Sequence, residues 1–159
     1  FMDEAHTLQE AADTLVVQVL GAHSRGRTIA KVSFFGALGF GRVGDPLLTS
    51  DGVAQVASLE DLLAHKLKVM LQRAEKKDYE DVAAMLRAGA SLARGLAAAR
   101  QMFGTSFQPA ASLKALTFFK DGDLRRLSQA DRHDLISAAA SVRELPRVAL
   151  RSRSLAIPL

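Results

Sequence analysis

The sequence predicts an α+β fold, in which a small N-terminal mixed β-sheet packs on a mainly helical C-terminal half. Two observations lead to this class. Apolar residues alternate with polar ones in short stretches before Ser58, whereas after Ser58 they recur at spacings of three and four. The chain has 159 residues, of which 48% are hydrophobic, enough for one core. We expect a single domain over residues 1–145 and a basic tail over residues 146–159.

The N-terminal part is expected to contain one helix and then the strands. Over residues 3–20 the spacing of the apolar residues is typical of an amphipathic helix, and Gly21 is a plausible end for it. Residues 28–35 alternate like a half-buried strand, with Ala30, Val32 and Phe34 on one face. Residues 36–48 contain four glycines and a proline, which exclude a helix there. "TSDG" then predicts a turn, and "VAQVA" predicts a short strand. The strands should therefore lie between about 28 and 57.

Helices are expected from residue 58 to about residue 145. Three of them are predicted to start where an oxygen-bearing side chain precedes an acid by three residues, because such side chains accept hydrogen bonds from free first-turn N–H groups. These pairs are Ser58 with Asp61, Asp78 with Asp81, and Ser128 with Asp131. "PAASLKALTFF" should form another helix, and "KDGDL" should end it. The tail from Pro146 has no periodicity and is expected to be an arm or disordered.

Composition excludes several classes of protein. The absence of cysteine rules out disulfides, a thiol nucleophile and thiolate metal sites. No apolar run is long enough to span a bilayer, and no signal-like segment opens the chain, so no membrane partner and a cytoplasmic location are expected. The four histidines, at positions 6, 23, 65 and 133, are isolated, and no metal site is predicted from them. The net charge of +4 owes much to arginines of the tail.

The stretch "HKLKVMLQRAEKKDYEDV", residues 65–82, has two interpretations. Lys66, Arg73 and Lys77 follow one another at spacings of seven and four, so on one helix they share a stripe that could line an open groove and hold a phosphate chain. Asp81 would lie beside them and orient a lysine or accept a proton. Alternatively, Asp78 caps a helix with Asp81 as its partner, and the lysines are a solvated face.

Three separated blocks resemble the nucleotidyltransferase-like toxins of the AbiEii/AbiGii abortive-infection family. The first is "KVSFFGALGFGRVGDPLL", the second is "ASLEDLLAHKLKVMLQRAEKKDYEDVAAML", and the third is "FQPAASLKALTFFKDGDL". Within the second block the family order of a lysine, an arginine, Lys-Asp and a further aspartate is supplied by Lys66, Arg73, Lys77, Asp78 and Asp81. The resemblance covers residues 28–142.

The resemblance implies a domain that binds a nucleoside triphosphate (NTP) with Mg²⁺ and transfers a nucleotidyl group to an RNA or protein target. Lys66, Arg73 and Lys77 would bind the nucleotide, and Asp78 or Asp81 would be the catalytic base or an orienting acid. An antitoxin or another protein partner is also implied. The family's Gly-rich turn and Asp-x-Asp metal pair lie upstream of the matched blocks, and the sequence has neither in that place. The chain alone is therefore expected to be inactive.

The sequence also offers one alternative metal motif and two alternative functions. "DGD", residues 121–123, has Asp-x-Asp form, but it follows a helical stretch as a polar loop and is expected to be a turn. The alternative function is a degenerate, non-catalytic interaction module, in which the truncated fold pairs with a protein through exposed strand edges. Simple nucleic-acid binding by the basic tail is the weakest function, because the tail has no interleaved aromatic residues.

Overall fold

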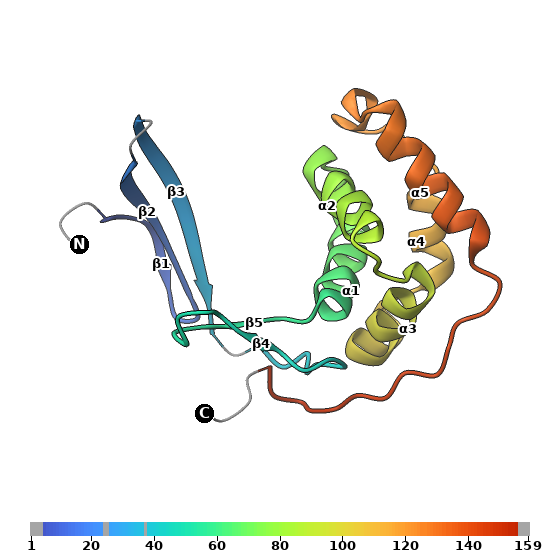
Figure 1. Ribbon diagram of the computed structural model, residues 1–159, viewed down its shortest axis with the longest axis horizontal. Helices are drawn as coiled ribbons and strands as arrows, with labels where there is room; N and C mark the ends of the chain where they lie inside the picture. The colour runs from blue at the N-terminus through green and yellow to red at the C-terminus, as the bar shows by residue number, and fades with distance from the viewer. Residues whose placement is uncertain (1–4, 24–25, 37, 156–159) are drawn as a thin grey trace. The chain divides into compact units, whose positions relative to one another are not determined.

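The computed structural model describes residues 5–23, 26–36 and 38–155. The chain divides into two compact units, residues 1–39 and residues 40–159, and each unit is described by itself. The first unit is a β-sheet, and the second contains a small hairpin followed by five α-helices (Figure 1). The predicted α+β class is confirmed, and so is the change from strands to helices at Ser58.

The sheet of the first unit is antiparallel and has three strands in the order β1-β2-β3. They are β1 (Ala5–Ala11), β2 (Thr14–His23) and β3 (Gly26–Phe35). The expected mixed sheet is corrected to an antiparallel one, because only two residues separate each strand from the next and parallel strands need a long crossover. The predicted strand at residues 28–35 is confirmed within β3.

The predicted helix over residues 3–20 is wrong, because this region forms β1 and most of β2. Its apolar residues fit a helical spacing, but β2 is rich in valine, which favours strands. The register shows the pattern that decides the structure: Leu15 pairs with Phe34 and Val17 pairs with Val32. Side chains on one strand alternate between faces, so these two pairs build one apolar face of the sheet.

The second unit begins with a loop and a short hairpin, β4 (Leu47–Leu48) paired with β5 (Gln55–Val56). The predicted turn at "TSDG" is present: the N–H of Gly52 donates to the carbonyl of Thr49 at 2.8 Å, and Gly52 has a φ of 72° that suits glycine. The loop before the hairpin is held by Asp61, whose carboxylate accepts from the N–H groups of Val43 at 2.8 Å and Gly44 at 3.1 Å.

Five helices follow, and they share one hydrophobic core. They are α1 (Leu59–Met70), α2 (Lys76–Arg87), α3 (Leu92–Phe103), α4 (Pro109–Ala115) and α5 (Gln129–Ser141), with 3₁₀ turns η1 (Gly104–Ser106) and η2 (Leu124–Arg126). Helix α1 contacts α2, α3 and α4, and α2 contacts α5. Leu63, Leu67 and Leu96 are among the fully buried side chains where α1 meets α3. Gly95 permits that approach, since a Cβ there would lie 2.6 Å from Leu63 Cδ2.

The capping predictions at Ser58 and Ser128 are confirmed. Each serine is the N-cap, and its Oγ accepts from the N–H of the acid three residues later, at 3.1 Å for Asp61 and 3.0 Å for Asp131. The acids then make tertiary contacts of their own. Asp131, for example, accepts from Arg87 of α2 at 2.9 Å, so this cap also joins α5 to α2.

The C-terminal tail is not a free arm over the part that the structure describes. Figure 1 shows it running from the end of α5 back along the unit, and Arg42 pairs with Ser152 in an antiparallel bridge. Val148 and Leu150 pack on the core, and Arg151 forms an ion pair with Asp45. These contacts lie far apart in sequence, which explains why local periodicity gave no sign of them. No helix among the described residues has the length and apolar character needed to cross a membrane.

Candidate functional site

The candidate site lies where the charged stretch breaks into two helices. Helix α1 ends at Met70 and α2 begins at Lys76, which confirms the predicted break before Asp78. Lys66 projects from α1, Arg73 lies in the connection, and Asp78 and Asp81 project from α2. The turn between the helices brings these four residues together, and we call them the Lys66 network.

The network is centred on the ammonium group of Lys66. Its Nζ donates to Asp78 Oδ1 at 3.0 Å and to Asp81 Oδ2 at 2.5 Å. Arg73 Nε donates to the other oxygen of Asp78, Oδ2, at 2.9 Å, and a longer contact of 3.4 Å joins Arg73 Nη2 to Oδ1. Both oxygens of Asp78 therefore have a cationic donor.

Asp78 is fully buried, whereas the side chain of Asp81 is 48% exposed. Burial alone would raise the pKa of Asp78, but the hydrogen bonds from Arg73 and Lys66 outweigh it and hold that pKa below its usual range. Burial also opposes the charge of Lys66, and the bonds to Asp81 and Asp78 raise the pKa of Lys66 nonetheless. The network is thus ionised on both sides at neutral pH.

The prediction that Asp78 caps α2 is wrong. Glu75 is the N-cap residue, and it makes no side-chain capping bond. The first N–H of the helix, that of Lys76, donates instead to Asp123 Oδ1 at 2.7 Å. Asp78 lies in the first turn of α2, two residues after Lys76, where Lys66 and Arg73 attract its carboxylate more strongly than a neutral N–H would. The predicted turn at residues 121–123 is present, with Gly122 at a φ of 50°.

Lys77 lies outside the network. Its Nζ pairs with Glu75 at 3.1 Å, and its side chain is 66% exposed. The expectation that Lys66, Arg73 and Lys77 share one stripe assumed a continuous helix. Because the chain bends over residues 71–75, the spacing of four between Arg73 and Lys77 no longer places them side by side.

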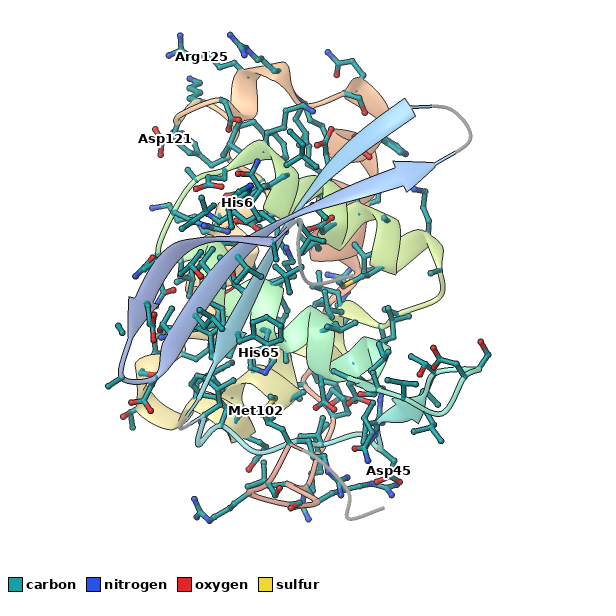
Figure 2. The ribbon with its side chains drawn as sticks, turned by 90° about the vertical axis from the view of Figure 1, so that its left-hand side faces the viewer. His6, Asp45, His65, Met102, Asp121 and Arg125 are labelled. Atoms are coloured by element: carbon teal, nitrogen blue, oxygen red, sulfur yellow. The ribbon has the colours of Figure 1, made fainter. Side chains whose placement is uncertain are left out.

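His65, labelled in Figure 2, belongs to an aromatic cluster that the sequence did not indicate. Its ring meets the rings of Phe40 and Phe103 edge-on at centroid distances of 5.3 Å, and the two phenylalanines lie 5.4 Å apart. Burial lowers the pKa of His65, although the charge of Asp61 partly opposes the shift. The neighbour of Lys66 is therefore a neutral packing residue on another face of α1.

The network fits a phosphate group better than a metal ion. Asp78 has both oxygens occupied by cations, and the described residues include no cluster of three or more histidines or acids able to hold a metal. The residues of the network therefore do not fit Mg²⁺. Lys66 has three N–H donors and uses two, and Arg73 is 46% exposed with guanidinium donors to spare. These free donors are suited to phosphate oxygens.

No curated protein and no solved structure matches the chain. A family model described as nucleotidyl transferase AbiEii toxin, type IV toxin–antitoxin system, matches residues 39–150. The match includes the whole Lys66 network and covers more than half of the chain. It confirms the resemblance inferred from the sequence, and the chain belongs to the AbiEii nucleotidyltransferase toxin family.

Proposed function

We propose that the Lys66 network is the phosphate-binding part of a nucleotidyltransferase site. Membership of the family implies NTP and Mg²⁺ as its general reagents and an antitoxin as its counterpart. The observation that carries the proposal is the position of Lys66 Nζ between Asp78 and Asp81, in the residue order that the family shares. A solvated charged face would not need a fully buried aspartate with two cationic partners.

The network would act by fixing cations before the nucleotide arrives. The buried carboxylate of Asp78 fixes the side chains of Lys66 and Arg73 through ion pairs, so their remaining N–H groups need little reorganisation to bind phosphate oxygens. Asp81, which is half exposed, is placed to orient Lys66 and to accept a proton from an acceptor hydroxyl. Transfer to an RNA or protein acceptor would also need the family's Gly-rich and Asp-x-Asp motifs, with their Mg²⁺ supplying electrostatic stabilisation of the triphosphate.

Nucleotide titrations test the phosphate-binding role. The chain is titrated with a fluorescent ATP analogue, and ATP and adenosine are used as competitors. We expect ATP to compete far better than adenosine, and we expect Lys66→Met to reduce the affinity at least tenfold. Lys77→Met removes the same charge outside the network and should change affinity by less than about threefold. Equal losses of ATP affinity from both substitutions would show that the overall positive charge of the protein attracts the nucleotide, and not a specific contact with Lys66.

The catalytic role needs a second assay. The chain is joined to the family's upstream motifs and incubated with Mg²⁺ and an NTP labelled at the α-phosphate, and label transfer to RNA and to protein is measured. Asp81→Asn should abolish transfer while preserving ATP affinity within a few fold, because the amide keeps the size of the side chain but cannot accept a proton. Unchanged transfer would remove Asp81 from the chemistry.

The three-stranded sheet favours a second candidate, a non-catalytic module that binds a protein partner. Strand β3 pairs only with β2 among the described strands, and it carries exposed Ile29, Phe34 and Phe35. An unpaired edge beside exposed apolar side chains can accept another strand. Co-purification with the cognate antitoxin, lost on Ile29→Lys together with Phe35→Lys, would support this function. Retention of the complex by that variant would argue against β3 as the binding edge.

A further inference from the structure

A cavity of the helical unit lies outside the proposed phosphate site, except that Arg73 belongs to both. It has a volume of about 550 Å³ and is bounded by the end of α1, the start of α2, α4 and the loop after α4. Its wall is mainly apolar, with Met70, Leu71, Ala115 and Leu124 among its residues. The volume lies within the range of small-molecule sites.

The cavity wall includes Tyr79, whose hydroxyl has no hydrogen-bond partner among the described residues. Tyr79 is only 2% exposed, and its ring packs edge-on against Phe119 at 6.2 Å. Its side chain nevertheless lines the cavity, and its hydroxyl makes no hydrogen bond with any residue that the structure describes. A tyrosine with a buried ring usually finds a partner for its hydroxyl. Burial, helped by the charges of Asp121 and Asp78, raises the pKa of Tyr79, so the hydroxyl remains a donor at neutral pH.

Three further polar side chains border the cavity without partners in the described part of the chain. They are Gln72, Lys114 and Asp121, and the last is labelled in Figure 2, at the surface of the loop after α4. Most other charged side chains near the site are paired, as Lys66, Lys76 and Lys77 are. The cavity therefore offers an amide, a cation and a carboxylate as well as the tyrosine hydroxyl.

Phe118 adds a flat apolar surface. It follows α4, lines the cavity and is 44% exposed. A half-exposed aromatic ring beside basic side chains is a stacking surface for a planar heterocycle. Arg73 is already paired with Asp78 and Glu75, so the rim offers the positive charge of Lys114 and the negative charge of Asp121. This combination suits a ligand that carries a phosphate together with hydroxyl or amino donors.

We propose that this cavity binds one nucleotide unit, with its base on Phe118, its base edge on Tyr79 and Gln72, and its phosphate beside Lys114. Asp121 is placed to accept from the ribose hydroxyls. The unit has two possible sources with the same chemistry, a free mononucleotide or the terminal nucleotide of a strand. The proposal goes beyond the triphosphate-binding function, because Tyr79, Phe118, Lys114 and Asp121 lie outside the Lys66 network.

The test uses the whole chain and the four ribonucleoside monophosphates as probes. Binding is followed by ¹H–¹⁵N NMR, so that shifts around residues 111–124 report this cavity and shifts around Lys66 and Asp81 report the phosphate site. A short RNA is the second probe and distinguishes a strand end from a free nucleotide. Leucine, a zwitterion of another chemical class, is the third. Saturable shifts at the cavity with a monophosphate or the RNA are the expected result.

Matched variants make the result decisive. Tyr79→Phe removes only the hydroxyl and keeps the ring in the core, and it should weaken binding about three- to tenfold. Lys114→Met should weaken it similarly, whereas Lys120→Met, which removes an equal charge from a residue that does not line the cavity, should have little effect. The proposal is overturned by three results: no shifts at the cavity with any nucleotide probe, shifts with leucine alone, or nucleotide binding that Tyr79→Phe and Lys114→Met leave unchanged in a folded protein.

Discussion

Replacing Lys66 with methionine tests how the buried Asp78 is held. Methionine keeps most of the length and apolar surface of lysine but removes the ammonium group. Asp78 Oδ1 then retains only the 3.4 Å contact from Arg73 Nη2, while Oδ2 keeps its 2.9 Å bond from Nε. Asp81 also loses a partner, but as a half-exposed side chain it can turn to water.

The structure sets the size of the effect. A buried acceptor that loses its hydrogen bond costs about 1–3 kcal/mol, and the exposed pair with Asp81 adds about 0–1 kcal/mol. Because Arg73 still neutralises Asp78, the total should stay below the roughly 3–5 kcal/mol of a fully orphaned buried charge. We expect a loss of about 2 kcal/mol in the free energy of unfolding, or a fall in Tm of about 4–8 °C for a chain of this length.

Thermal unfolding followed by circular dichroism at the helical band measures this loss, since the helices belong to the second unit. Lys77→Met is the matched control, because it makes the same substitution at an exposed position whose one ion pair among the described residues is with Glu75. It should cost less than about 0.5 kcal/mol. In the double variant with Asp78→Asn the loss should be smaller than the sum of the single losses. If Lys66→Met costs no more than Lys77→Met, Lys66 does not hold the buried carboxylate and the network is only a surface cluster.

Three further predictions concern packing, pH and capping. Gly95→Ala should destabilise the protein by about 1–3 kcal/mol, because the new Cβ would lie 2.6 Å from Leu63, whereas Gly39→Ala, with no atom within 4 Å of its Cβ, should be tolerated; urea denaturation compares them. Burial lowers the pKa of His65, so the unfolded chain takes up a proton at a higher pH than the folded protein does. The free energy of unfolding should therefore fall as the pH drops below about 6.5, by at most about 1.4 kcal/mol per pH unit. His65→Gln should flatten that part of a stability–pH curve. Asp123→Ala should cost about 1 kcal/mol and speed amide hydrogen exchange in the first turn of α2, and unchanged exchange there would argue against a distant cap.

The helical half could be read from the sequence because its signals are local. Ser58 and Ser128 cap their helices through bonds spanning three residues, and the apolar spacing of three and four follows from the helix itself. For residues 5–20 the helical spacing gave the wrong element, because this region forms β1 and most of β2. Their apolar positions satisfy a helical spacing by chance, and the preference of Val16, Val17 and Val19 for strands is realised only when β3 lies alongside.

Most residues of the candidate site could be named from the sequence, but their arrangement in space could not. The family-like order singled out Lys66, Arg73, Lys77, Asp78 and Asp81, and the structure brings all of them except Lys77 together. Lys77 pairs with Glu75 instead, and its predicted place on one stripe with Lys66 and Arg73 assumed a continuous helix. Asp78 was assigned to a cap by a local pattern, which could not reveal two cations supplied by the preceding helix and turn.

The sequence by itself determined the α+β class, the family and the positions of most helices, because these depend on composition, periodicity and short-range hydrogen bonds. Only the tertiary structure decided which polar and charged groups bond to one another across the chain. Asp123 caps a helix 47 residues earlier in the chain, and the tail returns to pair with Arg42. Tyr79, whose hydroxyl has no hydrogen-bond partner in the described part of the chain, likewise lines a cavity built by three helices. Such contacts depend on where separate elements meet in space, and the apolar core that brings them together forms between residues far apart in sequence.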